Sequence, residues 1–381
     1  MGGVPAPIPT RNPEDAILCV EDLRRAALKK MPRGVADFIN SGSTDQLTIH
    51  ENTTAYNKYR VRSRVLIDVC KADTSTTCFG QRMSFPLGCS PAGIQGLAHP
   101  DGELATSRAC SSKGVPMAIS SFANYPINEV RSAGLSAGPI KHAMQMYTLK
   151  NRDLEASIIR EAEAQGCTAI FLTADSPVLG VRYNEWRNDF RTPDGLGFPI
   201  YGWDTEKIRK QTHDDSFANL TDDAHSWARE VPWLRSITKM EIWIKGVVTA
   251  EDTLMAVGMG CDGIVVSNHG GRQLDGVPAT IDALPECVAA AAGRIRVHVD
   301  GGIRSGTDMF KAVALGAEFC WVGRPIFWGL SHSGREGVEL MLETFHQEFK
   351  RCMQLCGCNS IKDITPACLG VVRSDGPLAR L

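Results

Sequence analysis

The amino-acid sequence predicts a single closed α/β barrel preceded by a helical extension. Short apolar runs, several rich in Val and Ile, recur from residue 86 onward, and most are too short for core helices, which indicates buried parallel strands. They span residues 86–93, 116–121, 142–147, 169–175, 242–247, 263–270, 296–302 and 319–325. Amphipathic stretches such as 153–166 and 307–317 separate them, with apolar residues at helical spacing. Eight alternations of strand and helix favour a (β/α)8 barrel of the TIM type, and an open doubly wound sheet is the alternative.

The chain before the barrel has a different character. Residues 1–13 are rich in Pro and Gly, and a helix start is predicted at Asn12 and Pro13, with acidic residues in the first turn. The helical pattern runs to about Ile39, and residues 41–43 break it. The predicted organisation is one domain over 1–381, with a helical segment at 13–80 and the barrel at 86–360.

One interval interrupts the alternation. Residues 183–230, between the fourth and fifth strands, contain many polar and aromatic residues and are predicted to form a long loop. Loops of this length in compact domains are usually lids or binding loops, or are disordered. Because the interval follows the C-terminal end of a strand, we expect it to lie over the face where barrel enzymes carry out their chemistry.

The bulk composition excludes several classes of function. The formal net charge is -2 and no basic block occurs, so a nucleic-acid partner is not expected. No run of 18 or more apolar residues predicts a membrane span, and the first residues lack a secretory pattern. The 13 cysteines are scattered, as in a reduced intracellular protein. Cys352, Cys356 and Cys358 leave a zinc or disulfide site as the alternative.

Polar residues gather where the predicted strands end. In a barrel these ends converge on one mouth, so residues far apart in sequence form one site. The residues at these ends are Gln145, Tyr147, Thr173, Asp175, Lys245, the 267–272 segment, Asp300, Gly301, Gly302, Arg304, Gly323 and Arg324.

The ends of the seventh and eighth strands predict a phosphate site. Glycines at 301, 302 and 323 free backbone N–H groups, and Arg304 and Arg324 add forked cations. This is the habitual phosphate position of barrels. Structural salt bridges are the alternative for either arginine.

Two further pairings suggest chemistry on a carboxylate substrate. Asp175 beside His269 would raise the basicity of the imidazole and fix its tautomer. Arg182 and Arg272, if aimed into one cavity, would repel each other unless an anion lay between them. A buried lysine is costly without a partner, and Lys245 lies at a strand end. One partner would be a flavin cofactor, because the edge of its ring gains negative charge on reduction. A Schiff base between Lys245 and a carbonyl substrate is the alternative interpretation.

These residues lie in motifs that resemble a known family. The segments IKGVVTAEDT (244–253), SNHGGRQLDG (267–276) and VDGGIRSGTD (299–308) are similar to those of the FMN-dependent 2-hydroxy-acid oxidases and dehydrogenases. The likeness runs from about residue 13 to the C-terminus, and glycolate oxidases are nearest in length and ending. It implies oxidation of an L-2-hydroxy acid to the 2-keto acid, with FMN as the cofactor and no metal.

The resemblance also assigns roles at matching positions. His269 would be the catalytic base, oriented by Asp175, while Arg182 and Arg272 hold the substrate carboxylate with Tyr147 beside them. The flavin ring would rest on Pro91, Ala92, Gly93, Ser120, Gln145, Thr173, Lys245 and Ser267. The phosphate would take Asp300, Gly301, Gly302, Arg304, Gly323 and Arg324.

Three positions depart from the family pattern. Phe38 replaces a tyrosine whose hydroxyl would donate to the substrate carboxylate, and Phe122 replaces the usual tryptophan. Gly93 replaces the usual alanine beside the flavin, as in members that react poorly with oxygen. The first two departures concern the substrate, and the third concerns whether oxygen or another acceptor takes the electrons.

Other functions and the location stay open at this point. A different FMN barrel, such as an isomerase, would not need His269 with Arg272, and a barrel used only for binding would be expected to lose His269 or Lys245. The last residues, Ala379-Arg380-Leu381, resemble a peroxisomal address after an accessible polar tail, and the cytoplasm is the alternative location. A homo-oligomer, a tetramer by analogy, is expected from the family alone.

Overall fold

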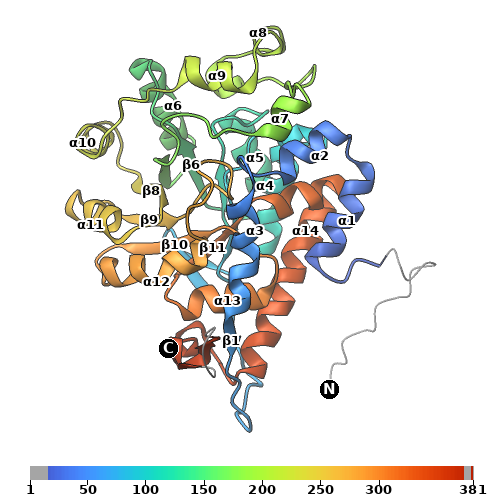
Figure 1. Ribbon diagram of the computed structural model, residues 1–381, viewed down its shortest axis with the longest axis vertical. Helices are drawn as coiled ribbons and strands as arrows, with labels where there is room; N and C mark the ends of the chain where they lie inside the picture. The colour runs from blue at the N-terminus through green and yellow to red at the C-terminus, as the bar shows by residue number, and fades with distance from the viewer. Residues whose placement is uncertain (1–15, 373–378, 381) are drawn as a thin grey trace.

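The computed structural model describes residues 16–372 and 379–380. Its centre is a closed barrel of eight parallel strands, at the positions predicted from the sequence (Figure 1). The strands are β4 (Leu87–Cys89), β5 (Met117–Ile119), β6 (His142–Met146), β7 (Ala169–Thr173), β8 (Glu241–Val247), β9 (Gly263–Val266), β10 (Arg296–Asp300) and β11 (Phe319–Val322). Cys320 of β11 is in register with Leu87 of β4, and this pairing closes the barrel. The open doubly wound sheet is therefore excluded.

Helices surround the barrel and cover the outward faces of its strands. They are α4 (Gly102–Lys113), α5 (Ile127–Ala137), α6 (Arg152–Ala164), α10 (Trp227–Ile237), α11 (Ala250–Gly258), α12 (Thr280–Ala291), α13 (Gly306–Ala314) and α14 (Arg324–Leu355). Asn151, Thr249 and Ser305 cap the first turns of α6, α11 and α13 by accepting backbone N–H bonds. The strands are buried along nearly their whole length, because one face lies inside the barrel and the other under these helices.

Aromatic side chains close the N-terminal end of the barrel. A hairpin of β2 (Thr76–Cys78) and β3 (Gln81–Met83) presents Phe79, whose ring lies 5.9 Å from Trp243 and 6.2 Å from Trp321. Strand β4 passes so close to Trp321 that a Cβ at Gly88 would lie 2.5 Å from the indole. The barrel interior is therefore packed, and the open end is the C-terminal one.

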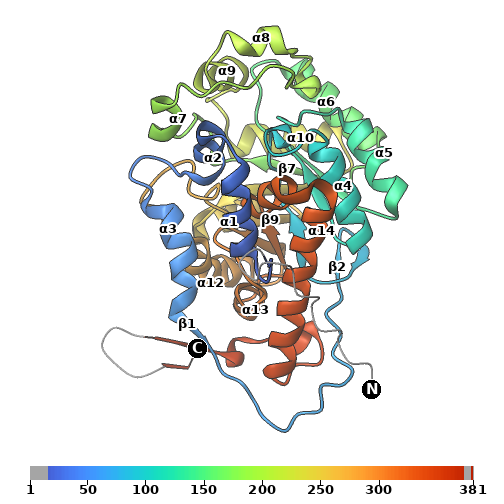
Figure 2. The ribbon, with the colours of Figure 1, turned by 90° about the vertical axis from the view of Figure 1, so that its right-hand side faces the viewer.

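The N-terminal segment packs against the last long helix and then reaches the open end. It forms α1 (Val20–Lys30), α2 (Arg33–Asn40) and α3 (Leu47–Thr54), followed by a 3-10 turn at Ala55–Lys58. Figure 2 shows α1 beside α14. The helix start predicted at Asn12 and Pro13 lies outside the described residues, whereas the predicted break at 41–43 is confirmed. Ser43 N–H donates to the Gly271 carbonyl (2.8 Å), which fixes this break at the barrel mouth.

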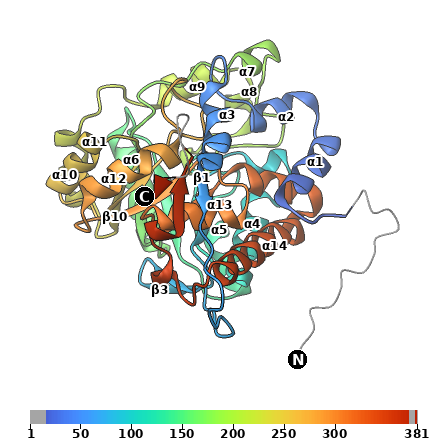
Figure 3. The same ribbon diagram turned by 60° about the horizontal axis from the view of Figure 1, so that its bottom comes forward.

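A small antiparallel sheet below the barrel pairs a strand that follows the N-terminal helices with strands near the C-terminus. It consists of β1 (Tyr59–Val61), β12 (Leu369–Val371) and β13 (Ala379–Arg380), and Figure 3 shows β1 beside the C-terminal end. Ala379 is in register with Val371, and Arg380 with Gly370. The expected accessible tail is thus paired as an edge strand at these two residues, and Leu381 lies outside the described residues.

The interval between β7 and β8, predicted as a long loop, folds into short helices. They are α7 (Tyr183–Arg187), a 3-10 turn at Pro199–Tyr201, α8 (Thr205–Arg209) and α9 (His213–Leu220), and residues 227–230 already belong to α10. We call residues 183–220 the lid. In Figures 1 and 2, α7, α8 and α9 lie together at one end of the molecule. A capping box starts α9, in which Thr212 accepts from Asp215 N–H and the Asp215 side chain accepts from Thr212 N–H.

The structure also bears on the alternatives for the cysteines and the membrane. All thirteen cysteines are free, and those at 352, 356 and 358 are buried. Across residues 16–372 and 379–380, no cluster of His, Cys, Asp and Glu has the makings of a metal site. Within the same residues, no helix has both the length and the apolar character that a membrane crossing requires.

Candidate active site

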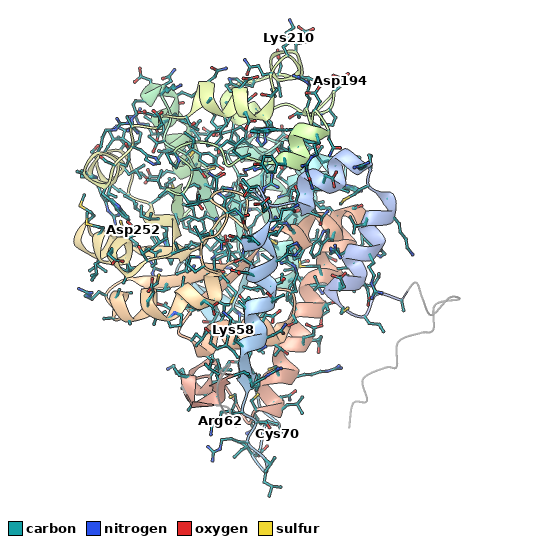
Figure 4. All side chains as sticks on the ribbon, viewed as in Figure 1. Lys58, Arg62, Cys70, Asp194, Lys210 and Asp252 are labelled. Atoms are coloured by element: carbon teal, nitrogen blue, oxygen red, sulfur yellow. The ribbon has the colours of Figure 1, made fainter. Side chains whose placement is uncertain are left out.

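A cavity opens at the C-terminal end of the barrel, under the lid. All the site residues predicted from the sequence line it except Asp175 and Ser267, which contact lining residues from behind. The lid closes the outer side of this cavity, and Figure 4 labels Asp194 and Lys210 at its outer end. The barrel topology therefore brings strand ends from the whole chain into one site, as expected.

His269 and Asp175 form the predicted acid–base pair. His269 Nδ1 lies 3.2 Å from Asp175 Oδ1, and Ser176 donates to the same carboxylate oxygen (3.1 Å). Burial lowers the pKa of His269 below 6.5; Asp175 opposes this shift, while Lys245 and Arg182 add to it. Burial acts to raise the pKa of Asp175, but pairing with His269 and the charge of Lys245 lower it overall. A neutral imidazole held by an ionised carboxylate is a suitable general base.

His269 is held in an unusual backbone conformation. Its φ is +57°, a left-handed value that few residues with a side chain adopt. Its backbone N–H donates to Ser267 Oγ (3.2 Å), which helps to hold this conformation. Strain of this kind is typical of functional positions, because the surrounding structure must maintain it.

Arg182 and Arg272 meet in the cavity around one buried carboxylate. Glu185 Oε1 accepts from Arg272 Nη2 (3.0 Å) and from Arg182 Nη1 (3.3 Å). Arg272 also donates to the Phe38 carbonyl (2.5 Å), and its guanidinium lies 4.9 Å from the centre of the Phe38 ring. Burial, followed by the charge of Arg182, lowers the pKa of Arg272 to about 10. One carboxylate for two buried cations leaves a net positive site, which suits an anionic substrate.

Glu185 also links these arginines to helix α9 of the lid. Its second oxygen, Oε2, lies 3.3 Å from His213 Nδ1 at the start of α9. Burial would raise the pKa of Glu185, but Arg272, His213 and Arg182 together lower it to about 2. The Glu185 side chain is therefore ionised at neutral pH and pairs with three cavity-lining side chains at once.

The predicted flavin wall is a connected polar network. Gln145 donates to Thr173 Oγ1 (3.0 Å) and accepts from Ser121 N–H (3.1 Å), while Ser120 Oγ accepts from Phe122 N–H (3.1 Å). These bonds fix the side chains before any ligand is bound. Ser120, Gln145 and Thr173 all face the cavity together with the 91–93 backbone.

Lys245 is paired inside the same wall. Its ammonium donates to Ser267 Oγ (2.8 Å) and lies 3.0 Å from Asp300 Oδ2. The predicted phosphate contact Asp300 is thus the counter-ion of Lys245, and its other oxygen, Oδ1, is buried without a hydrogen-bond partner. An ion pair at this place is compatible with a flavin edge that gains negative charge on reduction.

The arginines at the predicted phosphate position are half-buried, and neither forms a salt bridge with a carboxylate of the described residues. Arg304 donates only to the Ile303 carbonyl (2.8 Å), and burial lowers its pKa to about 10. Arg324 donates to the carbonyls of Ile39, Gly270 and Ser41, and burial and the charges of Arg272 and Arg304 lower its pKa. Half-buried cations that repel one another are stabilised by an anion between them, so these residues fit a cofactor phosphate. Arg324 in addition ties the end of α2 to the barrel.

The two aromatic departures pack into the lid. The Phe38 ring stacks on Phe190 at 4.4 Å, and Phe122 contacts Phe198 edge-on at 5.1 Å and Tyr201 at 5.2 Å. Aromatic side chains of the lid therefore cover these two positions, whereas Trp186 of the same segment is 53% exposed. Both Phe38 and Phe122 also line the cavity.

Sequence reasoning missed several residues of the site. Glu185 and His213 were not identified, nor were the apolar lining residues Leu179 and Phe217. A carboxylate three residues after Arg182 was a readable signal for Glu185, because side chains three apart meet on a helix. No local pattern marks His213, whose place depends on how the lid folds over the barrel.

Comparison with known proteins shows the family to which the chain is similar. The family model described as FMN-dependent dehydrogenase matches residues 27–371. Glycolate oxidase 3 of Arabidopsis thaliana is 45% identical over 351 residues, covering 91% of this chain and 94% of that protein. Oxidase FUB9 of Fusarium oxysporum f. sp. lycopersici is 42% identical over 366 residues, covering 95% and 93%.

Solved structures and a human relative agree with the family match. 2-Hydroxyacid oxidase 1 of Homo sapiens is 41% identical over 355 residues, covering 91% of this chain and 95% of that protein. A crystal structure of mandelate oxidase matches with a TM-score of 0.85 at 35% identity, covering 96% of this chain and all of that one. From the family match and these relatives we conclude that the chain is an FMN-dependent enzyme and belongs to the FMN-dependent dehydrogenase family.

Proposed function

We propose that this enzyme oxidises an L-2-hydroxy acid to the corresponding 2-keto acid. The observation that carries the proposal is the meeting of His269, held by Asp175, with Arg182 and Arg272 in one cavity. The relatives named as glycolate, 2-hydroxyacid and mandelate oxidases support it. Bound FMN supplies the acceptor for the two electrons that leave the substrate.

The side chains have distinct roles in this proposal. Arg182 and Arg272 bind the substrate carboxylate and so orient the α-carbon. Neutral His269 takes a proton from the substrate, and Asp175 stabilises the imidazolium that forms. Tyr147 lines the cavity beside them, and burial raises the pKa of its hydroxyl, which keeps it a hydrogen-bond donor.

The decisive experiment is anaerobic mixing of the purified, FMN-loaded protein with 2-hydroxy acids. Loss of the oxidised flavin absorbance, with a 2-keto acid formed in equal amount, is the expected result. Retained flavin colour with every acid tested would overturn the proposal and favour another FMN barrel. An enzyme that takes up no FMN would contradict the cofactor site itself.

Oxygen is the proposed electron acceptor, giving hydrogen peroxide. The relatives are named as oxidases, which favours oxygen as the acceptor. Gly93 points the other way, because family members that react poorly with oxygen have glycine at this position. Stopped-flow mixing of the reduced enzyme with oxygen separates the two cases. Fast reoxidation with peroxide release is expected, and negligible reoxidation would make the enzyme a dehydrogenase.

The substrate is proposed to be bulkier or more apolar than glycolate. Phe38 has no hydroxyl for the substrate carboxylate, and Phe122 is smaller than the tryptophan of the family pattern. One of the similar solved structures is that of mandelate oxidase with (S)-4-Hydroxymandelic acid, an acid with an aromatic side chain. A panel of acids of increasing side-chain size, tested on wild type and Phe38→Tyr, checks this. A strong wild-type preference for glycolate that the added hydroxyl leaves unchanged would contradict it.

Location and assembly are proposed on narrower grounds. The ending Ala379-Arg380-Leu381 supports a peroxisomal enzyme, and deleting it should leave a tagged protein in the cytosol. Peroxisomal import after that deletion would refute the address. A homo-tetramer is proposed from the family alone, and light scattering of the purified protein tests it.

A further inference from the structure

His213 is a lid residue whose polar edge faces the candidate active site. It begins α9, where the Thr212 capping box fixes the backbone. Its ring lies 5.7 Å from the Phe38 ring and 6.2 Å from the Phe122 ring, and it lines the same cavity as Arg182 and Arg272. The imidazole thus lies between the two positions where this chain departs from the family pattern.

The imidazole is fixed from one side only. Nδ1 lies 3.3 Å from Glu185 Oε2, and because Glu185 is ionised, Nδ1 must carry the hydrogen of this contact. Nε2 forms no hydrogen bond with the residues that the structure describes. A carboxylate that holds one ring nitrogen and so orients the other is found in metal-binding histidines and in the histidine of a Ser-His-Asp triad.

The two residues that depart from the family pattern beside His213 offer no hydrogen-bond donor of their own. Phe38 has no hydroxyl and Phe122 no indole N–H, so neither side chain can donate a hydrogen bond to an acid lying between them. His213 approaches both rings and is joined through Glu185 to the two arginines. Of the described lid residues, His213 and Phe217 line the cavity, and His213 is the polar one.

We propose that His213 is a specificity-determining residue that donates from Nε2 to the carboxylate of the bound acid, in place of the hydroxyl missing at position 38. Glu185 is its positioning residue, because the same carboxylate holds His213, Arg182 and Arg272 in one cluster. The consequence is that anion recognition depends on the lid helix α9 as well as on the barrel mouth. This inference rests on the proposed function for its substrate.

The test uses the full chain loaded with FMN and the variants His213→Phe, His213→Gln, Phe38→Tyr and the His213→Phe/Phe38→Tyr double variant. Oxalate, an unreactive dicarboxylate, is titrated against the flavin absorbance, and anaerobic flavin reduction by the best acid of the panel gives KM and the limiting rate. The matched control is His225→Phe, which changes another histidine of the 183–230 interval that lines a separate cavity.

The expected pattern is specific to a lost hydrogen bond. His213→Phe should weaken oxalate binding and raise KM by about 10- to 150-fold, while the limiting rate of flavin reduction changes much less. His213→Gln should keep most of the affinity through its amide N–H. Phe38→Tyr should restore binding in the His213→Phe background more than it improves wild type, because either donor can serve the same carboxylate.

Two results would overturn the inference. One is oxalate affinity in His213→Phe equal to that of wild type and His225→Phe. The other is an equal effect of Phe38→Tyr in both backgrounds, which would show that the two positions act independently. If His213→Phe disturbs the lid and loses flavin, His213→Ala in the same titration provides the comparison. Should no 2-hydroxy acid reduce the wild-type flavin, the proposed reaction fails, yet the oxalate titration still decides the role of His213.

Discussion

Replacing Glu185 with glutamine removes one charge from the centre of a buried cluster. The carboxylate pairs with Arg272 at 3.0 Å, Arg182 at 3.3 Å and His213 at 3.3 Å, and its side chain is 6% exposed. Together these partners lower its pKa from the ordinary 4.5 to about 2. At about 1.36 kcal/mol for each unit of difference, the ionised form contributes roughly 3 kcal/mol to stability.

The sign of the pH dependence follows from the lowered pKa. Because the folded protein binds this proton less readily than the unfolded chain, the contribution is complete above about pH 4.5 and is lost as the pH falls toward 2. Glu185→Gln should therefore be less stable than wild type by roughly 3 kcal/mol at pH 7, with a gap that narrows below about pH 4.5.

Urea unfolding followed by fluorescence, at several pH values between neutral and acid, measures this gap. Glu251→Gln is the control, because Glu251 is exposed on α11 and makes no ion pair in the described residues; it should change stability by less than about 0.5 kcal/mol. A Glu185→Gln variant as stable as wild type at pH 7 would refute the reasoning. A gap of the same size at every pH would assign the loss to packing instead of charge.

Three further changes test other parts of the site. His269→Ala should keep its FMN, but anaerobic stopped flow should show flavin reduction about 10²- to 10⁴-fold slower than in wild type. In wild type the rate of flavin reduction should fall only as the pH drops below 6.5, because burial lowers the pKa of His269. An unchanged rate in the variant would exclude His269 as the base. Arg304→Met should weaken FMN binding by about 1.5–3 kcal/mol in a flavin titration, and equal affinity would remove Arg304 from the phosphate site. Gly93→Ala should lower the melting temperature, with an overpacking penalty of about 1–3 kcal/mol, because the new Cβ would lie 2.9 Å from Phe122 Cβ. Adding Phe122→Ala, which keeps the Cβ of residue 122, should not restore the melting temperature. An unchanged melting temperature in Gly93→Ala would contradict the close approach.

The sequence predicted the barrel well because its signal is local and repeated. Each strand is a short apolar run and each helix an amphipathic stretch, so eight alternations fix the architecture without any knowledge of contacts. The strand-end residues follow from the same topology. His269 and Asp175, 94 positions apart, could be paired before the structure was known.

The lid could not be predicted in the same way. Helices of five residues, such as α7 and α8, are too short to show a period, so their sequences resemble a loop. The partners of Arg324 are three backbone carbonyls, and a backbone carbonyl leaves no trace in a sequence. The pairing of Ala379 with Val371 was also unreadable, because a polar tail gives no strand signal.

The aromatic side chains that close the N-terminal end of the barrel determine from which end ligands reach the cavity. In the part of the chain that the structure describes, Phe79 and Trp321 fill the base, and Trp321 also forms part of the cavity floor. The residues proposed to hold the flavin phosphate and those proposed to hold the acid line this one cavity, so FMN and the acid enter it from the C-terminal end of the barrel. A 2-keto acid that leaves by the same end would delay the next acid, whereas oxygen is small enough to need much less space.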